Sequence, residues 1–137
     1  MTDGQKTTII QRLRHSVQLL ASSPEVQLRH LPAYVSKADE LALELDQWSK
    51  IALHNYERDF SKEQLEALSA LNKKLDWLTN EGEQNWTEEA VRMSASWNEV
   101  RCLARAVLDS FGWPAETPPS HADEYRPAGQ NESSSVN

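Results

Sequence analysis

Cysteine, glycine and long apolar segments are scarce in this sequence of 137 residues, and each scarcity excludes a class of protein. The only cysteine is Cys102, so no disulfide can form within the chain. No run of about eighteen apolar residues is present, and residues 1–6 lack the apolar core of a secretory signal. From these absences we expect a cytoplasmic protein with no membrane partner.

Basic residues are outnumbered. The chain has 14 Lys and Arg against 21 Asp and Glu, a formal net charge of -7. Binding to nucleic acid or to an anionic membrane depends on a surplus of basic residues, so neither is the expected partner. A hydrophobic fraction of 39% is too high for a wholly disordered chain and sufficient for one globular core.

Motifs for catalysis, metal binding and phosphate binding are also missing. The four glycines form no phosphate-binding loop, and there is no Gly-x-Ser-x-Gly sequence. The histidines are not spaced as metal ligands, and Cys102 has no second cysteine with which to bind zinc. We therefore predict no cofactor, no metal site and no catalytic residue. The four histidines are His15, His30, His54 and His121.

The composition changes after Gly112. Residues 114–137 contain four of the six prolines, end in a polar serine-rich stretch and carry a net charge of -3, from one basic and four acidic residues. Such a segment has too little apolar surface to repay the entropy of ordering. We predict a helical domain over residues 1–113 and a disordered acidic tail over residues 114–137.

Apolar residues in the first part recur at steps of three and four, and no stretch of strict apolar and polar alternation is long enough for a strand. This spacing predicts an all-α fold, a compact bundle of four to five helices. The helix expected over residues 37–59 is apolar on more than one side, which predicts a central position. The expected core comprises Leu13, Val17, Leu20, Leu41, Leu45, Trp48, Leu65, Leu68, Leu75, Trp97, Val100, Leu103, Val107 and Phe111.

Capping residues mark where these helices begin and end. Serine or threonine precedes each expected helix after the first, and in two cases a Glu or Gln three residues later completes a capping box. Glycine is expected at the ends of the last two long helices, as a left-handed cap at the first of them. The expected N-caps are Ser23, Ser36, Thr87 and the boxes Ser61/Gln64 and Ser96/Glu99, and the glycines are Gly82 and Gly112.

The five tryptophans suggest a binding surface, and Trp77 is the clearest candidate. It falls opposite the leucine stripe of its helix, next to Lys73 and Lys74, which is the composition of an interface hot spot. The alternative is that another helix covers Trp77. With the acidic pair Glu88 and Glu89, these residues predict a protein–protein interaction module: an adaptor, a regulator or an inhibitor such as an immunity protein.

Other functions stay open. A pocket around the 37–59 helix, using Glu40, Glu44, His54 and Tyr56, would suit a small ligand or an enzyme. A helix-turn-helix over residues 87–111 would bind DNA through three residues of its second helix. The 37–59 helix could also mediate a homo-oligomer, and Cys102 is expected to be buried. The DNA-reading residues would be Asn98, Arg101 and Arg105.

Overall fold

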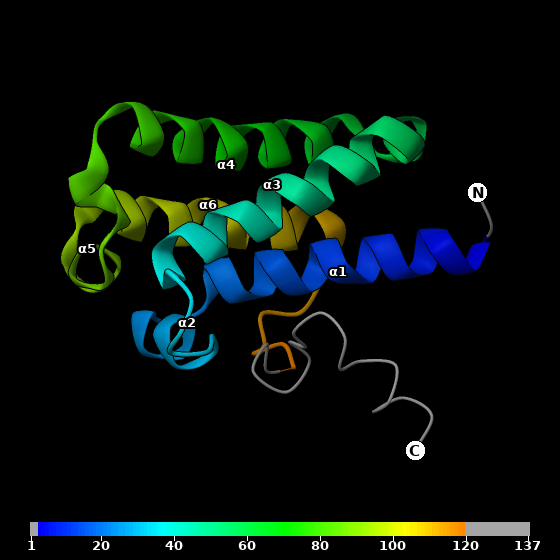
Figure 1. Cartoon of the computed structure of the whole chain (residues 1–137). Helices are drawn as coiled ribbons and strands as arrows, with labels where there is room; N and C mark the ends of the chain where they lie inside the picture. The colour runs from blue at the N-terminus through cyan, green and yellow to red at the C-terminus, as the bar shows by residue number, and fades with distance from the viewer. Residues whose placement is uncertain (1–2, 120–137) are drawn as a thin grey trace, which may run out of the picture.

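Four long helices alternate in direction along the chain and pack around one core (Figure 1). The computed structural model describes residues 3–119, and in this range every regular element is helical, which confirms the predicted all-α bundle. The long helices are α1 (Asp3–Ala21), α3 (Lys37–Tyr56), α4 (Lys62–Asn80) and α6 (Ala95–Phe111). The short elements are α2 (Pro24–Arg29), the 3₁₀ turn η1 (Glu57–Asp59), the 3₁₀ turn η2 (Glu83–Trp86) and α5 (Glu88–Met93).

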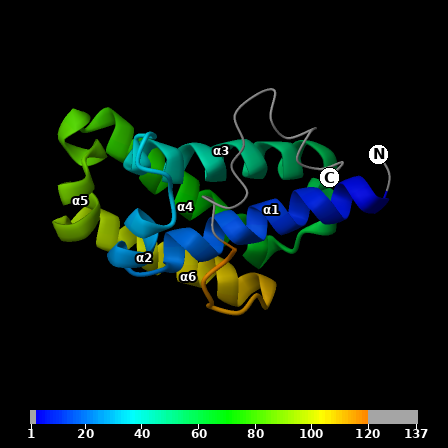
Figure 2. The same ribbon diagram turned by 60° about the horizontal axis from the view of Figure 1, so that its bottom comes forward.

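The long helices do not pack equally closely. Helix α1 lies along both α3 and α6, and α4 lies along α6. Helix α3 contacts α4 much less, and the two diverge from the turn η1 that joins them (Figure 1). The second view shows α2 beside α1, and the chain after α6 returning toward α1 (Figure 2). The bundle is therefore closed on three sides and open between α3 and α4.

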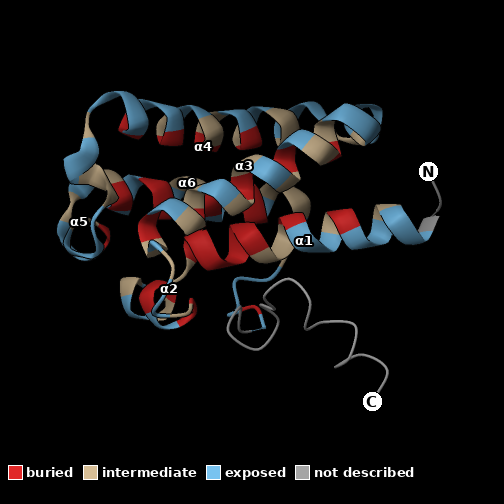
Figure 3. Cartoon of the chain, viewed as in Figure 1, coloured by how far each residue is buried: buried red, intermediate tan, exposed pale blue. Residues whose placement is uncertain are grey.

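The core lies between the long helices, and their buried residues face inward (Figure 3). Most of the predicted core is fully buried, but Trp48, Leu65, Leu103 and Phe111 are only half-buried. The largest buried apolar side chains are Leu13, Leu20, Leu41, Leu45, Leu68, Leu71, Leu78, Trp97 and Leu108.

Most helix starts agree with the prediction. Ser61 and Gln64 form the expected capping box, with bonds of 2.8 and 3.1 Å, and Ser23 and Thr87 cap α2 and α5. The box predicted at Ser96 and Glu99 is wrong, because Ser94 caps α6 and accepts from Trp97 N at 3.1 Å. Ser36 precedes α3 as expected, but its hydroxyl donates to Asp39 at 2.8 Å instead of capping the backbone.

The two predicted glycine caps differ from each other. Gly112 ends α6 with φ 69°, a left-handed conformation that glycine adopts without strain. Gly82 has φ 118° and ψ 169°, so it is not a left-handed cap. The C-cap of α4 is Glu81, and Gly82 precedes the turn η2. A side chain at Gly82 would be strained in this conformation.

The chain after α6 begins by following the bundle. Gln18 Nε2 donates to Pro114 O at 2.9 Å, His30 Nε2 donates to Pro119 O at 2.8 Å, and Pro118 is buried. Residues 120–137, with His121, lie outside the described range, and the predicted tail stays a prediction there. Among residues 3–119, no helix combines the length and the apolar character needed to cross a lipid bilayer.

Candidate functional site

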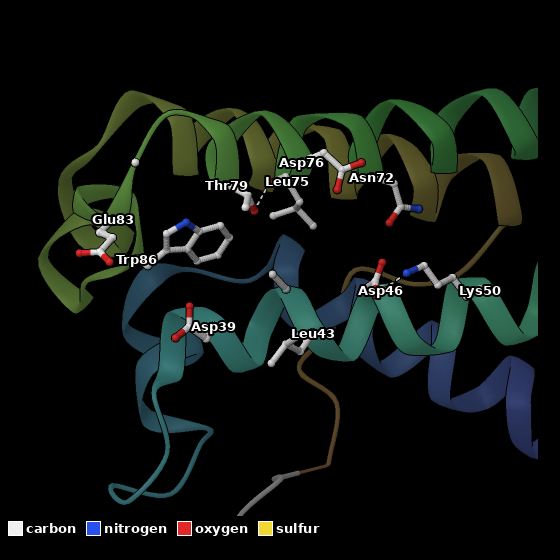
Figure 4. Close-up of a pocket in the computed structure, with 12 residues that line it drawn as sticks. Asp39, Leu43, Asp46, Lys50, Asn72, Leu75, Asp76, Thr79, Glu83 and Trp86 are labelled. Atoms are coloured by element: carbon white, nitrogen blue, oxygen red, sulfur yellow. Dashed lines mark hydrogen bonds and ion pairs between the residues drawn. The ribbon is translucent and has the colours of Figure 1, made fainter.

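A groove of about 670 Å³ lies between α3 and α4, where the two helices diverge, and η2 borders one end of it. Figure 4 shows side chains from both helices lining this space, with Trp86 at the η2 end. The lining residues are Asp39, Ala42, Leu43, Asp46, Lys50, Asn72, Leu75, Asp76, Thr79, Gly82, Glu83 and Trp86.

The apolar part of the groove combines the core residue Leu75 of α4 with residues outside the main core stripes. Leu43 is 59% exposed, so α3 turns a second apolar side to solvent. The predicted central position of this helix is therefore wrong. Trp86 is half-buried and packs edge-to-face on the core residue Trp97, with ring centroids 5.8 Å apart. Trp97 Nε1 donates to Asn85 O at 2.8 Å, which holds η2 against α6. The groove therefore has an apolar surface on a fixed support.

Carboxylates surround this apolar surface. The groove has four acidic residues and one basic residue, a formal charge of -3. Asp46 forms an ion pair with Lys50 at 3.0 Å, whereas Asp76 and Glu83 have no ion pair within the described part of the chain. The four acidic residues are Asp39, Asp46, Asp76 and Glu83, and the basic residue is Lys50.

Trp77 lies on the outer side of α4 and does not line the groove. It is 45% exposed, so the alternative in which another helix covers it is wrong. Lys74 Nζ lies 3.9 Å from the centroid of the Trp77 ring and 3.2 Å from Glu99 Oε1. Lys73 is exposed and lines a shallow depression on the same helix. The predicted cation-flanked tryptophan is therefore at the surface.

The predicted acidic pair lies on a different helix from Trp77. Glu88 and Glu89 are in the first turn of α5, and both are exposed. Glu88 forms a weak ion pair with Arg92, at 3.7 Å, one turn later in the same helix. Neither glutamate lines the groove. Their role in partner binding stays a prediction.

The alternative pocket residues lie on several sides of α3. His54 is exposed, and Glu40, Glu44 and Tyr56 are half-buried. Lys6 Nζ lies 5.3 Å from the centroid of the Tyr56 ring. None of the four residues lines the groove between α3 and α4. The α3 residues that do line the groove, among them Asp39 and Asp46, lie on another side of the helix.

Arg101, which the DNA-binding alternative would use, is only 3% exposed. Its Nη1 donates to Gln27 Oε1 and to Val91 O, both at 3.0 Å, and its Nη2 donates to Asn98 Oδ1 at 3.3 Å. Burial lowers the pKa of the Arg101 guanidinium, and nearby Arg105 lowers it further. Arg101 therefore joins α6 to α2 and α5 and cannot reach a base.

Cys102 is exposed, so its predicted burial is wrong. Arg105 Nη1 lies 3.7 Å from its sulfur, and both side chains are on the solvent side of α6. No group of three or more potential metal ligands occurs among residues 3–119.

Comparisons with protein-family models, with curated proteins and with solved structures found no significant match to this chain. The functional argument therefore depends on the geometry of the groove.

Proposed function

We propose that this protein is a protein-binding module whose α3–α4 groove receives a basic amphipathic helix of a partner protein. The observation that carries the proposal is the uncovered second apolar side of α3, where Leu43 is 59% exposed beside a ring of carboxylates. An exposed apolar surface rimmed by polar groups is typical of an interaction site.

A helix suits the groove better than an extended peptide does. Helices border the groove on both long sides, and an amphipathic helix fits such a space with its apolar side chains at steps of three and four. An extended peptide gains affinity by adding a strand to a sheet edge, and residues 3–119 contain no strand. The partner helix would take the place of a neighbour that α3 and α4 lack.

The charge of the groove selects a basic partner. Lys and Arg beside the apolar stripe of the partner helix would lie near Asp76 and Glu83, which have no ion pair in the described structure. The protein's own tail is a poor occupant, because residues 114–137 carry a net charge of -3 and would be repelled. Nucleic acid would be repelled for the same reason.

The test uses a synthetic 18-residue helix of leucine and lysine and a scrambled peptide of the same composition that is not amphipathic. Isothermal titration should show tighter binding of the amphipathic peptide, and amide chemical-shift changes should concentrate in α3, α4 and η2. Leu43→Ala removes three carbon groups from a side chain that is 59% exposed before binding, so it should weaken binding about tenfold.

The matched charge variants separate site binding from general attraction. Asp76→Asn with Glu83→Gln should weaken binding about two- to thirty-fold, because each exposed carboxylate contributes about 0.2–1 kcal/mol. Glu63→Gln with Glu66→Gln removes the same charge away from the groove and should change the affinity much less. Equal losses in the two pairs, or equal affinity for the two peptides, would refute the proposal.

A further inference from the structure

A second pocket, of about 410 Å³, lies on α1 and shares no lining residue with the groove. Three of its residues, Lys6, Ile10 and Arg14, follow one another at steps of four along α1. Trp113 completes it from the segment that returns toward α1 after α6 (Figure 2). The pocket is lined by Lys6, Thr7, Ile10, Gln11, Arg14 and Trp113.

Trp113 is held in place on this pocket. Its ring stacks on Phe111 with centroids 4.2 Å apart and planes 14° from parallel, and its backbone N–H donates to Leu108 O at 3.0 Å. Because Phe111 covers one face of the indole, the pocket can contact only the other face or an edge. The pocket therefore has one fixed aromatic wall.

Arg14 is the unusual residue of the pocket. Its Nε is buried and has no hydrogen-bond acceptor, although buried polar groups in proteins are almost always bonded. The structure gives no ion pair for Arg14 among residues 3–119. The guanidinium is charged at every physiological pH, so an arginine without an ion pair on the wall of a pocket favours an anion as the ligand.

The other positive charge is partly neutralised. Lys6 Nζ forms an ion pair with Asp59 and lies 5.3 Å from the centroid of the Tyr56 ring. Lys6 therefore adds to the positive potential without being the main anion ligand. None of the six residues that line the pocket is acidic, in contrast to the groove.

We propose that this pocket binds a planar organic anion, with a phosphate or carboxylate on Arg14 and a ring against Trp113. Guanidinium pairs with both oxyanions through two parallel N–H bonds, which the two Nη groups of Arg14 can supply together. A volume of about 410 Å³ is far larger than an inorganic ion needs and lies within the range of small-molecule sites. The site is independent of the function proposed for the groove.

Titration calorimetry with four probes on the full chain tests the ligand class: AMP, adenosine, benzoate and inorganic phosphate. A ring with an anion should bind more tightly than either part alone, and AMP should exceed inorganic phosphate by roughly five- to hundredfold, the value of base–aromatic stacking. The ratio of AMP to benzoate then decides between phosphate and carboxylate. Failure of both ring-bearing anions to bind, or equal affinity for AMP and inorganic phosphate, would overturn the proposal.

Variants locate the site. Arg14→Gln should weaken the better ring-bearing anion at least about tenfold, because it removes the charge and the two-bond contact. Arg14→Lys keeps the charge but removes the paired N–H donors, so its affinity should fall between those of the wild type and Arg14→Gln. If circular dichroism shows that Arg14→Gln does not fold, Arg14→Lys is the variant that tests the site. Arg12→Gln, an equal charge change outside the pocket on α1, is the control. An equal loss with Arg12→Gln would overturn the assignment.

The two proposals can fail separately. Asp76→Asn with Glu83→Gln lies in the groove and should leave AMP binding unchanged or slightly stronger, because two negative charges are removed. Arg14→Gln should leave binding of the leucine–lysine helix unchanged within twofold. Loss of both activities in either variant would show that the two sites are not distinct.

Discussion

Replacing Gln27 with leucine should lower the free energy of unfolding by about 2–6 kcal/mol. Gln27 is fully buried, and its Nε2 donates to Leu19 O at 3.2 Å and to Leu20 O at 2.9 Å. Leu20 O depends on this bond, because the residue four positions later is Pro24, which has no N–H. Leucine fills a similar volume without a donor, so the cost comes from polar groups left unpaired, about 1–3 kcal/mol for a carbonyl.

The remaining cost falls on Arg101. Gln27 Oε1 accepts from Arg101 Nη1 at 3.0 Å, and every acceptor that the structure gives to this buried guanidinium is a neutral oxygen. Removing one acceptor leaves a buried charge less well solvated, which adds about 1–3 kcal/mol. The total is a large part of the 5–15 kcal/mol by which a domain is usually stable.

Urea unfolding followed by tryptophan fluorescence measures this prediction in four proteins: wild type, Gln27→Leu, Arg101→Met and the double variant. If the two residues act as a pair, the double variant should lose at least about 1 kcal/mol less than the sum of the single losses. Arg105→Met, an exposed arginine one turn later, should cost no more than about 0.5 kcal/mol. Additive losses, or a loss below about 1 kcal/mol in Gln27→Leu, would refute the reasoning.

Three further predictions test the surface and the helix ends by the same unfolding assay. Trp77→Ala should cost about 1.5–2.5 kcal/mol, about half of the cost at a buried site, because the ring is 45% exposed and also loses its cation–π contact with Lys74; a loss above about 4 kcal/mol would mean that the ring is core. Ser61→Ala and Ser94→Ala should each cost about 1 kcal/mol, and Ser96→Ala should cost about half of that or less. A larger loss for Ser96→Ala than for Ser94→Ala would mean that Ser96 caps α6 after all. Leu43→Ala should change the unfolding free energy by less than about 1 kcal/mol while it weakens peptide binding. A much larger loss of stability would mean that Leu43 is a core residue and not a surface residue.

Local signals predicted the fold well where a single residue decides the geometry. The Ser61/Gln64 box and the Gly112 cap involve groups within a few positions of one another, so the sequence alone fixes them. The start of α6 was missed because Ser94 and Ser96 are both suitable caps. In the structure α6 begins after Ser94, Trp97 is fully buried, and Glu99 pairs with Lys74 at 3.2 Å instead of completing a capping box.

The candidate site was harder to predict, because an apolar stripe shows which residues can be buried but not how closely two helices approach. Leu43 lies outside the main stripe of α3. An apolar residue in this position predicts a central helix, which is the wrong prediction here. The same signal results when α3 packs closely on α1 and diverges from α4, which leaves the second apolar side facing a groove. The choice depends on contacts between residues far apart in the sequence, such as Ser49 Oγ to Asn72 Oδ1 at 3.5 Å.

The formal net charge of -7 excludes fewer partners than it suggests, because each charge acts only over a short range. Of the formal -7, the tail carries -3, and the four carboxylates and one ammonium of the groove carry -3, which leaves about -1 for the rest of the chain. The screening length in cells is about 8 Å, so an anion in the pocket of Arg14 and Lys6 responds to these cations more than to the distant groove. A nucleic acid has to neutralise many phosphates along an extended surface and meets the acidic groups as well. The acidic composition therefore argues against a polyanion but leaves room for a single small anion at a basic pocket.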